Sequence, residues 1–102
     1  MFTEQDMVDI NKLISLLKQV IIYLQESGCG ELSYKGLNKS INILENKAIN
    51  GMGNIYFHIM GDFRMMADRG QYGEEHIDTL MTEIYHIIMN NLLFRNQRGK
   101  TK

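Results

Sequence analysis

The sequence predicts an all-α fold, a compact antiparallel bundle of about four helices. The first observation is that glycine pairs divide the chain at three places: Gly28/Gly30, Gly51/Gly53 and Gly70/Gly73. The second is that the 102 residues contain no proline, which would interrupt helices internally. The third is that apolar residues recur at helical spacing between the glycine pairs. Because glycine adopts the left-handed conformations that end helices, each pair predicts a break.

The first helix is expected from Thr3 to Ser27. Thr3 is a suitable N-cap, and Glu4 and Asp6 place carboxylates in the first turn, where the helix dipole favours them. One apolar stripe consists of Ile10, Leu13, Ile14, Leu17, Val20, Ile21 and Leu24.

Three further apolar residues of this helix, Val8, Leu16 and Ile22, lie outside the stripe. We therefore expect this helix to be covered on more than one side, either by its own domain or by a second copy of the chain.

The second helix is expected from Ser33 to Asn50. Its narrower stripe consists of Tyr34, Leu37, Ile41, Leu44 and Ala48. Gly36 weakens its first turn by about 1 kcal/mol relative to alanine.

The third segment, from Asn54 to Arg69, admits two interpretations. Residues 54–60 are rich in aromatic and β-branched side chains, as strands are. The helical interpretation depends on a single face formed by Ile55, Ile59, Phe63 and Met66. Because no second clear strand is present to pair with a first, we favour a helix and keep the strand as the alternative.

The last helix is expected from Glu74 to Arg95, with an acidic start and a basic end that both suit the helix dipole. Its stripe consists of Ile77, Leu80, Met81, Ile84, Ile88 and Leu92. Residues 1–95 are predicted to form a single helical domain. Residues 96–102 have no apolar side chain and are predicted to form a flexible basic tail.

The composition favours a cytoplasmic protein. Hydrophobic residues make up 44% and charged residues 23%, as in folded soluble domains. Cys29 is the single cysteine, so no disulfide can form within the chain. The richest apolar stretch, Leu13–Leu24, contains Lys18 and fits neither a signal peptide nor a membrane span. The last eight residues, 95–102, contain only four cations, so we expect no direct binding to nucleic acid.

Candidate catalytic and metal-binding groups are few. Glu83 and His86 have the Glu-x-x-His spacing of carboxylate-bridged metal sites, but the motif occurs once and points away from the apolar stripe. His58 and Asp62 stand four residues apart and could pair on a helix face, without a marked nucleophile. We therefore predict no enzyme, no catalytic residue, no metal and no cofactor.

The methionines of the third segment allow two interpretations. Met60, Met65 and Met66 lie close in sequence to Phe57 and Phe63. Such a group can form an adaptable binding groove, but a small bundle also needs large apolar residues for its core. We favour the core.

The most informative polar feature is an acidic stretch. Within 22 residues the chain carries Asp62, Asp68, Glu74, Glu75, Asp78 and Glu83, interleaved with Tyr72 and Tyr85. Exposed carboxylates with tyrosines suit docking of a basic protein, because charge steers the encounter and aromatic rings anchor it. An ordinary solvated face with helix-start acids is the other interpretation.

The chain resembles the small all-α immunity proteins of bacterial toxin–immunity systems, including those of contact-dependent growth inhibition. The resemblance is carried by the segment Ala48-Ile-Asn-Gly-Met-Gly-Asn-Ile-Tyr-Phe-His-Ile-Met-Gly-Asp-Phe-Arg-Met, in which a helix ends into Gly-Met-Gly before an amphipathic segment. It implies a cytoplasmic inhibitor that binds one cognate toxin and covers its active site. Many such toxins are nucleases with cationic clefts.

We therefore expect an immunity protein that blocks a cognate toxin, a basic nuclease, through an acidic helical face. The expected toxin-binding residues are Asp68, Tyr72, Glu75, Asp78, Glu83 and Tyr85. One alternative is a helical adaptor or self-associating regulator that forms a homodimer through the first helix. A second is a small metal-dependent or hydrolytic enzyme.

Overall fold

A computed structural model describes residues 2–26, 34–68 and 75–95. Every regular element in these ranges is helical, which confirms the predicted all-α class. Residues 96–102, predicted as a tail, lie outside the described ranges. In chain order the elements are α1 (Glu4–Glu26), α2 (Lys35–Asn46), α3 (Ile49–Met52), α4 (Ile55–Asp68), α5 (Glu75–Asn90) and the 3-10 helix η2 (Leu92–Phe94).

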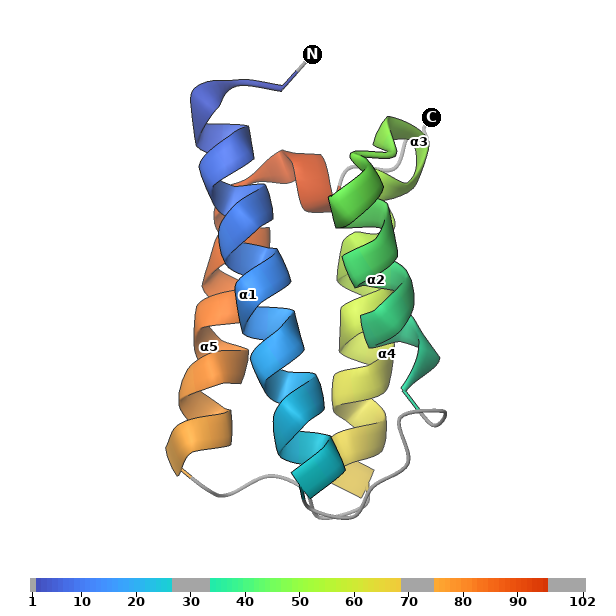
Figure 1. Ribbon diagram of the computed structural model, residues 1–102, viewed down its shortest axis with the longest axis vertical. Coiled ribbons are helices and arrows are strands. Elements are labelled where there is room, and N and C mark those ends of the chain that lie inside the picture. Colours follow the sequence, from blue (N-terminus) through green and yellow to red (C-terminus); the bar gives the residue numbers. More distant parts are fainter. Residues whose placement is uncertain (1, 27–33, 69–74, 96–102) are drawn as a thin grey trace.

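The four long helices are arranged in two layers (Figure 1). In that view α1 and α2 lie in front and run in opposite directions, with α5 behind α1 and α4 behind α2. α1 packs along both α5 and α2, and α2 packs along α4, whereas α4 and α5 share few contacts. The radius of gyration of 13.3 Å is close to the value of about 13 Å expected for a domain of this length.

α1 is covered on two sides because it packs against two helices. Its predicted stripe is buried or partly buried along its whole length. Leu16, which lies outside that stripe, is also buried, while Val8 and Ile22 remain 52% and 51% exposed. Leu16 is therefore covered by its own domain, whereas Val8 and Ile22 are not, and their cover by a second copy stays a prediction.

The N-terminus of α1 is closed by reciprocal hydrogen bonds, as Thr3 at the N-cap predicts. The Asp6 backbone N–H donates to Thr3 Oγ1 at 3.0 Å, and the Thr3 backbone N–H donates to Asp6 Oδ2 at 3.0 Å. This is a capping box with aspartate as its acid. The same backbone N–H of Thr3, together with the amide of Asn91, lowers the pKa of Asp6 below its usual value.

α2 ends four residues before the predicted boundary. Lys47 adopts the left-handed conformation (φ 50°, ψ 44°) that glycine usually provides, and its N–H and that of Ala48 bond to the carbonyls of Leu44 and Ile43. This pair of bonds is a Schellman motif. The chain then starts the short helix α3, so Ala48 is exposed instead of completing the apolar stripe. Ser33, the predicted start of the helix, lies outside the described residues.

The helical interpretation of the third segment is confirmed, and the strand alternative for residues 54–60 is excluded. α4 buries Ile55, Ile59, Phe63 and Met66, the four residues of the predicted face.

α5 is shorter than predicted because Asn91 leaves the helix. Asn91 is extended (φ −134°, ψ 111°), and its side-chain oxygen accepts from the Leu93 N–H at 3.0 Å. Its amide nitrogen donates to Asp6 at 2.9 Å and to Asp9 at 3.0 Å, which ties the end of α5 to the start of α1. Leu92, predicted to be buried, is therefore 60% exposed, and Phe94 is buried instead.

The N-terminus of α2 is capped by α4. Tyr34 occupies the N-cap but its side chain does not cap the helix, and the Leu37 N–H donates instead to Asp62 Oδ2 at 2.7 Å. The approach is so close that a Cβ at Gly36 would collide with the backbone carbonyl oxygen of His58. Asp62 is only 6% exposed, so including it in the exposed acidic stretch was wrong. It is a helix cap supplied from 25 residues away.

Burial raises the pKa of Asp62 above its usual value, although the backbone N–H groups of Leu37 and Gly36 favour its ionised form. Burial also lowers the pKa of His58, with help from the charge of Lys39 and against the attraction of Asp62. His58 therefore sits beside the cap as a partly buried imidazole that favours its neutral form.

Gly36 in α2 and Gly61 in α4 should respond oppositely to alanine. Gly36→Ala is expected to destabilise the fold by about 1–3 kcal/mol, because the added Cβ meets the His58 carbonyl. Gly61→Ala has open space around the new Cβ and should stabilise the protein by about 0.5–1 kcal/mol. Urea unfolding measures both, and equal effects of the two substitutions would contradict the close α2–α4 contact.

The raised pKa of Asp62 predicts a specific pH dependence of stability. The folded protein holds the Asp62 proton more tightly than the unfolded chain, so this group's contribution falls as pH rises from about 3.8, the unfolded value, through the higher folded pKa. Asp62→Asn cannot titrate, while its amide oxygen can still accept from Leu37. The free energy of unfolding of the natural protein minus that of Asp62→Asn should therefore decrease with rising pH. Urea unfolding at several pH values between about 3.5 and 7 measures this difference, and an increase would contradict the assignment.

Candidate functional site

The exposed side of α5 carries an acidic face, defined here by five residues. Glu75, Asp78 and Glu83 are exposed on it, and α5 contains no lysine or arginine. Counted from Glu75, the other four members of the face lie 3, 4, 7 and 8 residues further along the chain, which puts all five on one side of the helix. Thr79 turns its hydroxyl inward along the helix and donates to the Glu75 carbonyl at 2.8 Å. A shallow hollow of about 490 Å³ is lined by this set: Glu75, Asp78, Thr79, Thr82 and Glu83.

A second and larger hollow, the α4/α5 groove, lies beside the acidic face. Its volume is about 650 Å³. It exists because α4 is packed on α2 and α5 on α1, so that α4 and α5 are not in close contact along their length. Eight residues line it: Tyr56, Met60, Phe63 and Arg64 from α4, and Asp78, Met81, Thr82 and Tyr85 from α5.

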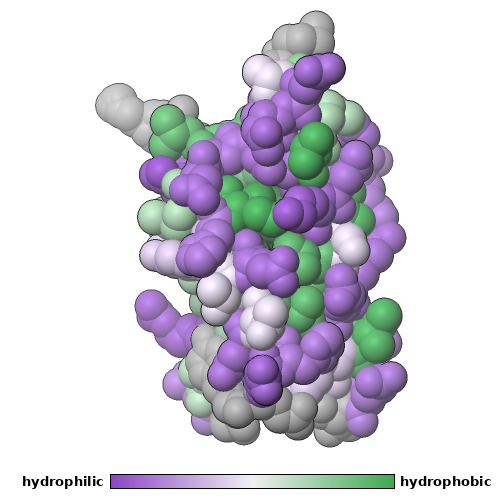
Figure 2. Space-filling view, turned by 90° about the vertical axis from the view of Figure 1, so that its left-hand side faces the viewer, coloured by the Kyte–Doolittle hydropathy of each residue, from purple (hydrophilic) through white to green (hydrophobic). Residues whose placement is uncertain are grey.

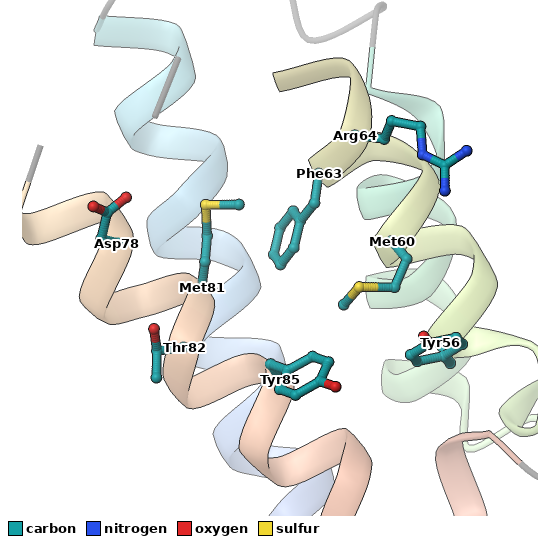
Figure 3. Close-up of a pocket in the computed structure, with 8 residues that line it drawn as sticks. All are labelled: Tyr56, Met60, Phe63, Arg64, Asp78, Met81, Thr82 and Tyr85. Atoms are coloured by element: carbon teal, nitrogen blue, oxygen red, sulfur yellow. The ribbon is translucent and has the colours of Figure 1, made fainter. Parts of the chain in front are cut away.

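The side chains of the groove are arranged in two zones (Figure 3). Arg64 and Asp78 lie at one end, on opposite sides. Phe63 and Met81 extend toward each other from the two helices and are nearly buried. At the other end Tyr85, 43% exposed, extends across toward α4. The groove thus has a charged end, an apolar floor and an aromatic end.

The acidic face and the groove are continuous. Asp78 and Thr82 line both hollows, one turn apart on α5. A molecule seated in the groove would therefore lie directly against the carboxylates of α5.

Four of the predicted site residues are brought together on α5. Glu75, Asp78, Glu83 and Tyr85 are all exposed there, and two of them also line the groove. Asp68 is exposed at the last position of α4. The remaining predicted residue, Tyr72, lies outside the described residues.

The α4 side of the groove was not predicted as a site, although the methionine cluster pointed to it. Met66 is buried in the core, as the favoured interpretation predicts. Met60 and Met65 are partly exposed, and Met60 lines the groove. Each interpretation therefore holds for part of the cluster: Met66 belongs to the core and Met60 to the groove, while Met65 is partly exposed.

The Glu-x-x-His pair singled out in the sequence lies on the surface of α5. Glu83 and His86 are exposed on α5, as their position off the stripe predicts. Within residues 2–26, 34–68 and 75–95, no group of three His, Cys, Asp or Glu side chains is placed to hold a metal ion. Cys29 lies outside these ranges. None of the helices in the same ranges has the length and apolar character needed to cross a membrane.

The side of the molecule on which α1 and α5 lie is mostly hydrophilic (Figure 2). Hydrophobic residues gather there in a narrow strip and in isolated spots rather than in a broad patch. On α1, Val8 and Ile22 are exposed but 14 residues apart, with exposed Ser15 between them. The surface of α1 therefore lacks a continuous apolar stripe.

Comparison with known protein families, curated proteins and solved structures gives no match for this chain.

Proposed function

We propose that this antiparallel four-helix bundle is a cytoplasmic immunity protein that binds and blocks a basic bacterial toxin, a nuclease, without catalytic activity of its own. The observation that carries the proposal is the acidic face of α5, where three exposed carboxylates stand without a lysine or arginine on the same helix. A cationic cleft that normally holds a nucleic acid would meet complementary charge there.

The α4/α5 groove supports the same proposal. An exposed apolar hollow beside a charged surface is typical of a protein-binding site, since anchoring side chains need a place where water is excluded. The resemblance of residues 48–65 to immunity proteins supplies the biological class. The negative charge of the acidic face indicates a basic partner.

A second candidate is a self-associating helical regulator that dimerises through α1. The exposed apolar side chains Val8 and Ile22 favour it. Sedimentation of the purified protein distinguishes the two, because a tight homodimer that is lost in Ile22→Lys supports the regulator.

The first test is genetic. The tagged chain is expressed in its native cells, the captured protein is identified, and its gene is expressed alone and together with this chain. The immunity proposal requires that the captured protein is toxic alone and that this chain rescues growth. A captured partner without toxicity contradicts it.

Reversing charges on the acidic face should then slow association. Glu75→Lys with Asp78→Lys is expected to lower the association rate with the toxin at least about tenfold at low salt and to flatten its salt dependence, because steering charge is lost. Stopped-flow or surface-binding kinetics at two ionic strengths measures both quantities.

The matched control carries the same change in charge elsewhere. Glu26→Lys with Glu45→Lys alters exposed residues of α1 and α2. It breaks the surface ion pair of Glu45 with Lys18 (2.8 Å), which is worth at most about 1 kcal/mol. An equal loss of rate in both double variants would show that net charge alone, and not the α5 face, attracts the partner.

A further inference from the structure

We propose that the α4/α5 groove receives two turns of an amphipathic helix that carries lysine or arginine on the flank facing α5. The inference rests on the proposed function in one respect, namely that the toxin supplies this helix. The occupant's chemistry is argued from the groove itself.

The dimensions of the groove fit a short helical segment. Its lining spans Tyr56 to Arg64 on α4 and Asp78 to Tyr85 on α5. At 1.5 Å per residue these spans are roughly 10–12 Å long, the length of about two helical turns. Two turns present apolar side chains at positions i, i+4 and i+7, which is the spacing of the anchor side chains that an amphipathic helix places in a groove.

The floor of the groove suits such anchors. Phe63 and Met81, 5% and 7% exposed, close the bottom of the groove, and the more exposed Met60 and Tyr85 stand on either side and offer most of the apolar surface (Figure 3). Methionine side chains adapt to different aliphatic or aromatic partners. Tyrosine adds a rigid ring whose hydroxyl remains at the rim, where it reaches water or the partner.

Charge decides between possible occupants. The α5 rim carries Asp78 and continues into Glu75 and Glu83, whereas the α4 rim carries Arg64. A helix with cations toward α5 and neutral or acidic residues toward α4 meets complementary charge on both sides. The α1 helix of a second copy fits poorly, because its exposed apolar residues Val8 and Ile22 are separated by about 21 Å of mostly polar surface.

The test uses the full-length protein and a designed probe, a helical peptide with leucine at i, i+4 and i+7, lysine on one flank and alanine elsewhere. A second peptide replaces lysine with glutamate. Methyl-labelled methionines report the position of binding, since Met60 and Met81 line the groove while Met52 and Met66 are buried in the core. NMR titration measures both affinity and place.

The lysine peptide is expected to shift the methyl signals of Met60 and Met81 and to bind at least about tenfold more tightly than the glutamate peptide. Tyr85→Ala, which removes an anchor, and Thr82→Trp, which fills the groove from an exposed position, should each weaken binding about tenfold or more. His86→Ala is the matched control. It removes the neighbouring exposed ring on α5, which does not line the groove, and should change affinity less than about twofold.

The inference would be overturned by equal binding of both peptides, by no shift of Met60 and Met81 at millimolar peptide, or by unchanged affinity in Tyr85→Ala and Thr82→Trp. Shifts of the same methyls with protein concentration alone would identify a second copy as the occupant and also overturn it. If a toxin binds Tyr85→Ala and Thr82→Trp with normal affinity, the groove is not its binding site, and the immunity proposal is unaffected. If the peptide binds in the groove but no toxic partner is found, the immunity proposal is contradicted, and the groove remains a helix-binding site.

Discussion

The close contact between α2 and α4 is the constraint on which the rest of the structure depends. Gly36 has no side chain, so the backbone of α2 can approach the His58 carbonyl, and this approach brings Asp62 within 2.7 Å of the Leu37 N–H. The contact satisfies an N–H group that the start of α2 leaves without a local cap, and it fixes the spacing of the two helices at the same time. Ser40, one turn after Gly36, is fully buried, and its small side chain takes up little space on this side of α2.

The groove follows from the way the helices are paired. α4 is held to α2 by the Asp62 cap, and α5 is held to α1, where Asn91 bonds to Asp6 and Asp9. The two helices of the rear layer are therefore each fixed to a different front helix, and few contacts join them to one another. Closing the gap would bury further apolar surface at roughly 25 cal/mol per Å², so an open groove gives up stability that the chain could otherwise gain. Such a surface is typical of a binding site.

Local periodicity predicted the helices, and long-range contacts explain what it missed. The buried face of α4 could be predicted because Ile55, Ile59 and Phe63 repeat every four residues, and the exposure of Glu75 and Asp78 follows from their positions off the α5 stripe. The role of Asp62 could not be predicted, because its partner is 25 residues away. The end of α5 at Asn91 depends on carboxylates 85 and 82 residues earlier in the chain.

The candidate site was predicted only in part for the same reason. The carboxylates of α5 are a property of one helix and its stripe. The groove depends on which helices pack against each other. Met60 and Met81 line it because α4 packs against α2 and α5 packs against α1, so that α4 and α5 share few contacts. The residue pattern of a single helix does not reveal which helix it packs against. The methionine-rich segment was therefore compatible with a place in the core and with a place in a groove.

In the proposed complex the charged and apolar parts of the site would have different physical tasks, and neither would suffice alone. Exposed carboxylates in water contribute roughly 0–1 kcal/mol each to an ion pair and are screened by salt, so the acidic face would speed encounter more than it would hold the partner. Tight binding would need anchor side chains that become buried against apolar surface, and the lining of the groove around Phe63 and Met81 offers such surface. Asp78 belongs to both surfaces. A partner steered to α5 by charge would therefore already be at the mouth of the groove, so that in the proposed complex steering and anchoring would be consecutive steps at one site.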